Sequence, residues 1–148
     1  MKRTALTITS AACLLAAAVP ASAAGATAFR GQTSQKRLAS VVTEADGTPK
    51  RVRIGWKAPC TTGATYTTIT RFVSPFDAQQ PGSFTDAGTF HGKIPGYRVT
   101  FKAAASGSLQ ADGSWAGTFA IKATVRKKGK WVDTCRLKQV SWTAQPLG

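Results

Sequence analysis

The chain has 148 residues, with 20 lysines and arginines against six aspartates and glutamates, so its formal net charge is +14. This length accommodates one domain that can bury a single core. The few carboxylates leave little material for acid–base catalysis. The positive charge makes the chain soluble and self-repelling, and it attracts polyanions without selecting among them.

The N-terminal residues have the parts of a secretory signal peptide. A basic start, MKR, precedes the apolar run TALTITSAACLLAAAV and an A-x-A cleavage site at 21–23. The apolar run is too short to span a membrane, and the residues before Cys13 are a poor lipobox. We therefore predict a secreted, extracellular protein with a cleaved signal at 1–23. Residues 24–148 then form a single domain with a net charge of +12, because Lys2 and Arg3 leave with the signal.

Two cysteines, Cys60 and Cys135, remain after cleavage. An even pair in an exported chain predicts one disulfide, here closing a loop of 75 residues. In the chain-entropy model such a cross-link stabilises the fold by roughly 4 kcal/mol. A structural zinc site needs four Cys or His ligands, and His91 alone accompanies the pair, so we expect no metal and no cofactor. A catalytic thiol would leave the second thiol idle.

Apolar and polar residues alternate along the chain after the signal, with almost no helical periodicity. In RVRIGWKAPC every second residue from Val52 to Cys60 is apolar or small, which predicts a half-buried strand with Trp56 inside. QVSWTA repeats this pattern with Trp142, but out of phase with Cys135, so a bulge is expected near 138–139. Strands are predicted at 27–33, 37–43, 50–58, 65–73, 97–104, 107–111, 114–126 and 130–144.

Turn signals separate these strands. Asp46-Gly47, Asp112-Gly113 and Lys128-Gly129 lie between alternating runs, where glycine accepts the positive φ that a tight hairpin needs. About eight short strands and no helix predict an all-β, antiparallel, hairpin-rich domain. A β-sandwich with one disulfide is preferred, and a closed β-barrel is the alternative.

The segment 74–96 breaks the alternation, with three prolines and four glycines. We predict that it is irregular apart from one short strand at 88–94, and that it is functional or mobile. It holds Asp77, Asp86 and His91, with Ser83 or Thr85 nearby. No nucleophile elbow accompanies them, so we expect no catalytic residue and a protein that is not an enzyme. A small secreted hydrolase using this segment, or an inhibitor module presenting it to another protein, are the alternatives.

Several aromatic and acidic side chains have expected positions. Trp115 and Trp131 flank hairpin turns and are expected to be exposed. Asp133 is expected to face outward, where it could pair with a basic residue. Four phenylalanines around the irregular segment are expected to plug one end of the core, and lining a pocket is the alternative; these are Phe72, Phe76, Phe84 and Phe90.

The basic residues gather in two stretches. RKKGK at 126–130 forms a hairpin tip with Lys122, Arg136 and Lys138 on its arms, and PKRVRIGWK lies on an earlier strand. These stretches predict a basic face that binds anionic envelope or extracellular polymers. No sequence-specific nucleic-acid binding is expected, and the protein is expected to be a monomer. Lysines that only protect a strand edge are the other interpretation. The predicted binding residues are Arg51, Arg53, Lys57, Arg126, Lys127, Lys128 and Lys130.

Three stretches carry a resemblance: FRGQTSQ at 29–35, VRIGWKAPC at 52–60, and C-x4-V-x-W-x-A at 135–144. Together they resemble small exported all-β proteins and domains of high-GC Gram-positive bacteria. The resemblance implies secretion, a β fold and the disulfide. It implies no activity and carries no functional residue, because the shared positions belong to the core and the disulfide.

Overall fold

The computed structural model describes residues 25–148, and the expected signal peptide at 1–23 lies outside them. The described residues form one antiparallel sheet. They contain no helix that is long and apolar enough to cross a membrane. The strands are β1 (Thr27–Thr33), β2 (Leu38–Thr43), β3 (Pro49–Pro59), β4 (Thr65–Val73), β5 (Ala78–Gln80), β6 (Ser83–Ile94), β7 (Tyr97–Leu109), β8 (Trp115–Lys127) and β9 (Lys130–Pro146).

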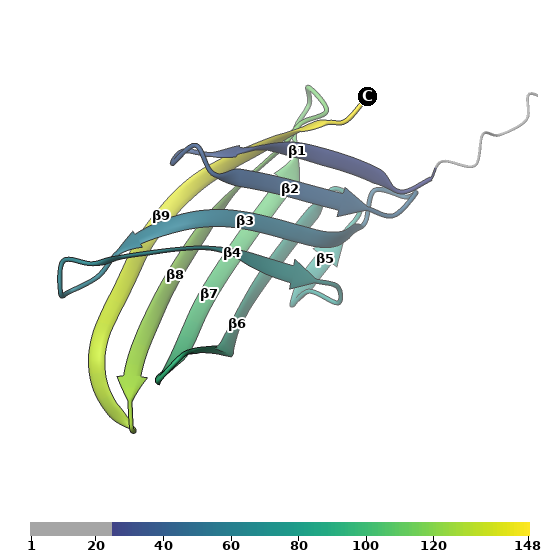
Figure 1. Ribbon diagram of the computed structural model, residues 1–148. Coiled ribbons are helices and arrows are strands. Elements are labelled where there is room, and N and C mark those ends of the chain that lie inside the picture. Colours follow the sequence, from purple (N-terminus) through teal and green to yellow (C-terminus); the bar gives the residue numbers. More distant parts are fainter. Residues whose placement is uncertain (1–24) are drawn as a thin grey trace, which may run out of the picture.

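The strand order is β4-β3-β2-β1-β9-β8-β7-β6-β5, so the first and last strands pair and β4 and β5 are the two edges. Residues 74–77 connect these edges directly. Five residue steps span at most about 18 Å, far less than the width of a flat sheet of nine strands spaced about 4.8 Å apart. The sheet is therefore coiled, and in Figure 1 the β1–β4 half crosses over the β6–β9 half.

The expectation of an all-β, antiparallel, hairpin-rich fold with one disulfide is confirmed. Its two layers are halves of one continuous sheet, joined where β1 pairs with β9. The sheet is open, because β4 and β5 end it without pairing to each other. The two layers are therefore continuous through β1 and β9, and the sheet does not close into the hydrogen-bonded ring of a barrel.

Aromatic rings fill the space between the two halves. The ring of Trp56 on β3 lies 6.4 Å from Phe101 on β7 and 6.3 Å from Phe119 on β8, between ring centroids. Its indole Nε1 donates to Thr70 Oγ1 at 2.8 Å, so the buried polar atom is satisfied. The predicted burial of Trp56 and Trp142 is confirmed.

The indole of Trp142 lies against two glycines that are paired across β7 and β8. A Cβ atom on Gly107 or Gly117 would come within 2.7 Å of its ring carbons. Close packing of this kind tolerates no added methyl group without movement of the neighbours. The two glycines therefore let a large side chain of β9 lie flat against β7 and β8.

The predicted turns and bulge are confirmed. Gly47, Gly113 and Gly129 have φ angles of 84°, 82° and 79°. Phe119 pairs with Val140 and Ile121 with Leu137, so residues 138–139 of β9 face a single residue of β8. The bulge restores the inward direction of both Cys135 and Trp142, which are buried.

Two aromatic predictions have different outcomes. Trp115 is buried, so its predicted exposure is wrong, because its ring packs between Phe29 and Phe84, each with its centroid 6.2 Å away. Trp131 is exposed as predicted. Three of the four phenylalanines are buried in the core, whereas Phe90 is exposed; the buried ones are Phe72, Phe76 and Phe84.

The prediction of an irregular segment at 74–96 is wrong. Most of it forms β5 and the twelve-residue strand β6, which pairs with β7 along its whole length. The two strands predicted at 97–104 and 107–111 are one strand, β7, which ends at Leu109. Beyond its pairing with β5, β6 has an unpaired edge and stays largely exposed on both faces. The alternation that reveals a half-buried strand is therefore missing from its sequence.

Candidate functional site

Alternation in β7 and β8 turns one set of side chains into the core and the other set outward. On β7 the core side chains include Val99, Phe101 and Ala103, and the outward ones between them include Arg98 and Lys102. On β8 the same pattern leaves Lys122 and Arg126 exposed. The cations point outward because the neighbouring positions supply the core.

The register of the sheet brings these outward cations side by side. Lys102 lies directly opposite Lys122, which lies opposite Arg136 on β9. A second row begins with Lys93 on β6, continues through Arg98 on β7 and ends with Arg126 on β8. We call this surface the cationic face; it consists of Lys93, Arg98, Lys102, Lys122, Arg126 and Arg136, all exposed.

The two rows of the cationic face are separated by four residues along each strand, or roughly 13 Å. Between them lies a row of hydrogen-bonding side chains, in which neighbouring residues are again direct partners: His91, Thr100, Thr124 and Thr134. Thr100 Oγ1 and His91 Nδ1 are 3.4 Å apart. The face therefore offers hydroxyl and imidazole groups between two bands of positive charge.

No carboxylate in residues 25–148 neutralises the cationic face. The one ion pair among these residues joins Lys50 and Glu44, at the β2–β3 turn. Asp86 and Asp133 lie on strands of the face but pair with Ala105 and Val125, whose side chains turn to the opposite side. Like charges directly opposite each other destabilise a sheet, so stability does not explain this arrangement.

The sequence-predicted basic residues fall into two separate groups. Arg53 and Lys57 are exposed on the outer face of β3, and Arg51 is half-buried. The other four are exposed at the β8–β9 tip, where Arg126 belongs to the cationic face; the rest are Lys127, Lys128 and Lys130. Eight residues of extended chain, roughly 26 Å, separate Lys57 from Lys130 through the Cys60–Cys135 bridge. The disulfide therefore does not bring the two groups together.

A further row of basic residues, separate from the cationic face, crosses the outer face of β1–β4. Arg30 pairs with Ser40, Ser40 with Arg53, and Arg53 with Arg71. This row holds three cations spread over four strands, so it is sparser than the cationic face. It includes Arg53, which the sequence singled out, and Arg71, which it did not.

Sequence reasoning missed Lys93, Arg98 and Lys102 as site residues. Two of them alternate with apolar residues in YRVTFKA, and that pattern marks them as outward. Lys93 gave no such signal, because the strand that carries it was not recognised. Lys122 and Arg136 were expected beside the hairpin tip, and they lie opposite each other in the face.

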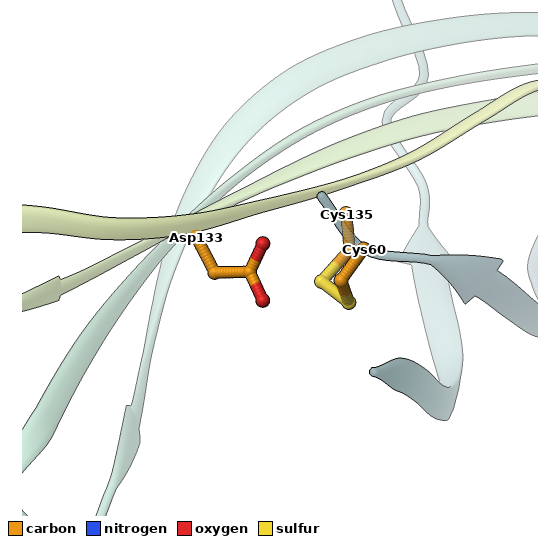
Figure 2. Close-up of side chains that lie close together, drawn as sticks. All are labelled: Cys60, Asp133 and Cys135. Carbon is orange, nitrogen blue, oxygen red and sulfur yellow. A yellow bond between two sulfur atoms is a disulfide. The ribbon is translucent and has the colours of Figure 1, made fainter. Parts of the chain in front are cut away.

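The disulfide and Asp133 form a second cluster, seen in Figure 2. Cys60 and Cys135 are bonded, with an S–S distance of 2.00 Å, and Asp133 lies beside them. The outward direction predicted for Asp133 is wrong: its side chain is buried, because alternation from the buried Cys135 turns it inward. Its Oδ1 accepts from Thr61 Oγ1 at 2.7 Å, and its Oδ2 accepts from Thr62 Oγ1.

These contacts shift the pKa of Asp133 strongly. Hydrogen bonds from the hydroxyls of Thr62 and Thr61 lower the pKa of Asp133 to about 2. The three potential ligand atoms lie within 4.8 Å of one another, but bonded sulfurs are not thiolates, which zinc requires. The cluster therefore has a structural role, because its disulfide and hydrogen bonds connect β9 to the loop that follows β3.

The residues of the hydrolase alternative are not brought together. Asp86 and His91 lie on opposite faces of β6, because five positions separate them along a strand. Burial, and secondarily the charge of Asp77, raise the pKa of Asp86. Thr85 shares a face with His91 but lies six residues away, roughly 20 Å. The segment is also a strand rather than the rigid loop that the inhibitor alternative requires.

Comparison of the chain with protein-family models, with curated proteins and with solved structures gave no match.

Proposed function

We propose that this protein is an exported, non-enzymatic module that binds anionic polymers of the cell envelope or the extracellular space through the cationic face. The observation that carries the proposal is the direct cross-strand register of like charges without a nearby carboxylate. Such a surface raises the local concentration of polyanions and gains affinity through release of their counterions. The predicted signal peptide and the disulfide support a role outside the cytoplasm.

The threonine row supports a polymer rather than a single small anion. A chain lying along the strands would meet a band of cations, then hydroxyl groups, then a second band of cations. Its charged groups would contact lysine and arginine, and its uncharged groups would meet Thr100 and Thr124, which are half-buried and lie directly opposite each other. No pocket is required, since flat polymer binding depends on repeated contacts of this kind.

The proposal is tested with phosphocellulose resin and soluble polyphosphate as probes. Changing Lys102, Lys122 and Arg136 to glutamine should weaken binding and lower the slope of log affinity against log salt by about 2, at roughly 0.7 per lost phosphate contact. The matched control changes Arg30, Arg53 and Arg71 to glutamine, which removes the same charge from the opposite layer. Equal losses in both variants would assign binding to net charge and would contradict the proposed face.

A further inference from the structure

Two neighbouring turns lie at one end of the sheet, beyond the β1–β4 layer (Figure 1). Residues 95–96 connect β6 to β7, and residues 128–129 connect β8 to β9. The ring of Tyr97 lies under Lys127, whose Nζ is 5.4 Å from the ring centroid, so side chains of the two hairpins are in contact. We call this part of the molecule the distal end; it comprises Ile94, Tyr97, Lys127, Lys128, Lys130 and Trp131.

The distal end exposes apolar side chains on both hairpins. Trp131 is 57% exposed and Ile94 is 37% exposed. An open hollow of about 1240 Å³ lies between the turns, and its lining includes Ile94, Pro95 and Tyr97. Single exposed apolar residues are ordinary, but here they occupy adjacent turns at the same extremity. The exposed apolar surface is therefore shared by both turns of the distal end and is not confined to one residue.

Cations surround these apolar side chains. Arg98, Arg126 and Lys128 also line the hollow, and Lys127 and Lys130 flank the β8–β9 turn. The nearest carboxylate along β9, Asp133, is buried and already bonded to Thr61 and Thr62. A partner for this end must therefore carry negative charge and must also accept tryptophan and isoleucine. A hydrophilic polymer meets only the first requirement.

An anionic bilayer meets both requirements. Its headgroups attract lysine and arginine near the surface, and each cation that comes close strengthens binding roughly fivefold. Tryptophan and tyrosine favour the interface between headgroups and acyl chains, where the ring is in an apolar layer and the polar atom stays hydrated. We propose that the distal end docks on an anionic lipid surface, with Trp131 and Ile94 entering the headgroup region.

This inference rests on the proposed function only through the shared row of Lys93, Arg98 and Arg126. The row of Lys102, Lys122 and Arg136 contributes to polymer binding alone and lies roughly 13 Å farther from the turns. Ile94 belongs to neither row of the cationic face, whereas Trp131 lies opposite Arg126 and donates from its indole Nε1 to Thr134 Oγ1 at 2.9 Å. The two activities are therefore separable by substitution.

The test is co-sedimentation of the exported protein with phosphatidylcholine vesicles that contain phosphatidylglycerol, compared with pure phosphatidylcholine. The protein should bind the anionic vesicles and bind the neutral ones at least tenfold more weakly. Changing both Ile94 and Trp131 to threonine should reduce vesicle affinity at least tenfold, and changing Ile94 alone should weaken vesicle binding while leaving phosphocellulose retention unchanged. The matched control changes Ile69 and Leu109, each 46% exposed elsewhere, to threonine and should leave both activities unchanged.

Three outcomes would overturn the inference: no binding to anionic vesicles, vesicle binding by the Ile94 and Trp131 variant equal to that of the wild type, or loss of phosphocellulose retention in the variant of Ile94 alone. The triple glutamine variant of Lys102, Lys122 and Arg136 separates this failure from failure of the polymer site. It should lose retention on phosphocellulose while keeping most of its vesicle binding. Circular dichroism of each variant checks that the β fold is retained.

Discussion

Asp133 is the residue whose environment departs most from what its type suggests. A carboxylate ordinarily lies in water, yet this one is buried beside the disulfide and accepts hydrogen bonds from the loop after β3. The backbone N–H of Thr134 also donates to it, at 2.7 Å. These donors favour the charged form, which explains why its pKa falls to about 2.

We expect this residue to make stability depend on pH in the acid range. The unfolded chain takes up the proton near the ordinary pKa of 3.8, whereas the folded chain resists it until about 2. The stabilisation is therefore complete above 3.8 and is lost as the pH falls toward about 2. Urea unfolding of the wild type and of Asp133→Asn, at about pH 6 and about pH 2.5, measures this loss.

The variant should unfold more readily at the higher pH and should show a smaller loss of stability on acidification. Asp46 and Asp112 also have pKa values below the ordinary one, through hydrogen bonds from Thr48 and Ser114 in their turns. They are present in both proteins, so the difference between wild type and variant isolates Asp133. Identical acid dependence in the two proteins would show that the hydrogen bonds of Asp133 contribute nothing to stability.

At the scale of elements, the Cys60–Cys135 bond ties the β3–β4 hairpin to β9. The two cysteines are 75 residues apart in the sequence. Their backbones also pair in an isolated antiparallel bridge, which joins the end of β3 to β9. The neighbouring N–H of Thr61 donates to the carbonyl of Thr134 at 3.0 Å. The cross-link and this hydrogen bond therefore fix one layer of the coiled sheet against the other.

Removing the disulfide should lower the free energy of unfolding by about 4 kcal/mol, because the unfolded chain regains the freedom of a 75-residue loop. Urea denaturation of Cys60→Ala/Cys135→Ala against the oxidised wild type measures the change. Reduced wild type is the control and should match the variant. A loss below about 1 kcal/mol would mean that the layers hold together without the cross-link.

Much of the strand pattern could be predicted because alternation and glycine turns are local signals. The hairpin at Asp112–Gly113 even fixes that Lys102 faces Lys122, since both are ten residues from Asp112. The pairing of Lys122 with Arg136 could not be predicted in this way. A register shift near Val125 and Arg126 leaves Val132 of β9 without a partner, and nothing in the local sequence marks that bulge.

The remaining errors come from edges and from contacts between distant strands. β6 gave no strand signal because a strand exposed on both faces has no apolar period. Trp115 was expected in water because it follows a turn, but its ring packs against Phe29 on β1. Such contacts depend on strand order, which local patterns do not contain.

At the scale of the whole molecule, the charge is distributed unevenly. The β6–β9 half carries the six residues of the cationic face within two rows, and the β1–β4 half carries a sparser row. The coiling of the sheet points these two outer surfaces in different directions, so a polymer meets one of them at a time. Binding should therefore be localised rather than spread over the surface.

The most direct measurement is mapping of amide chemical shifts in the isotope-labelled protein during titration with soluble polyphosphate. The largest changes should cluster at Lys102, Lys122, Thr124 and Arg136, and should reverse on addition of salt. Arg30, Arg53 and Arg71 should change little at the same polyphosphate concentration. Changes centred on β1–β4, or spread evenly over all lysines and arginines, would contradict a binding site on the cationic face.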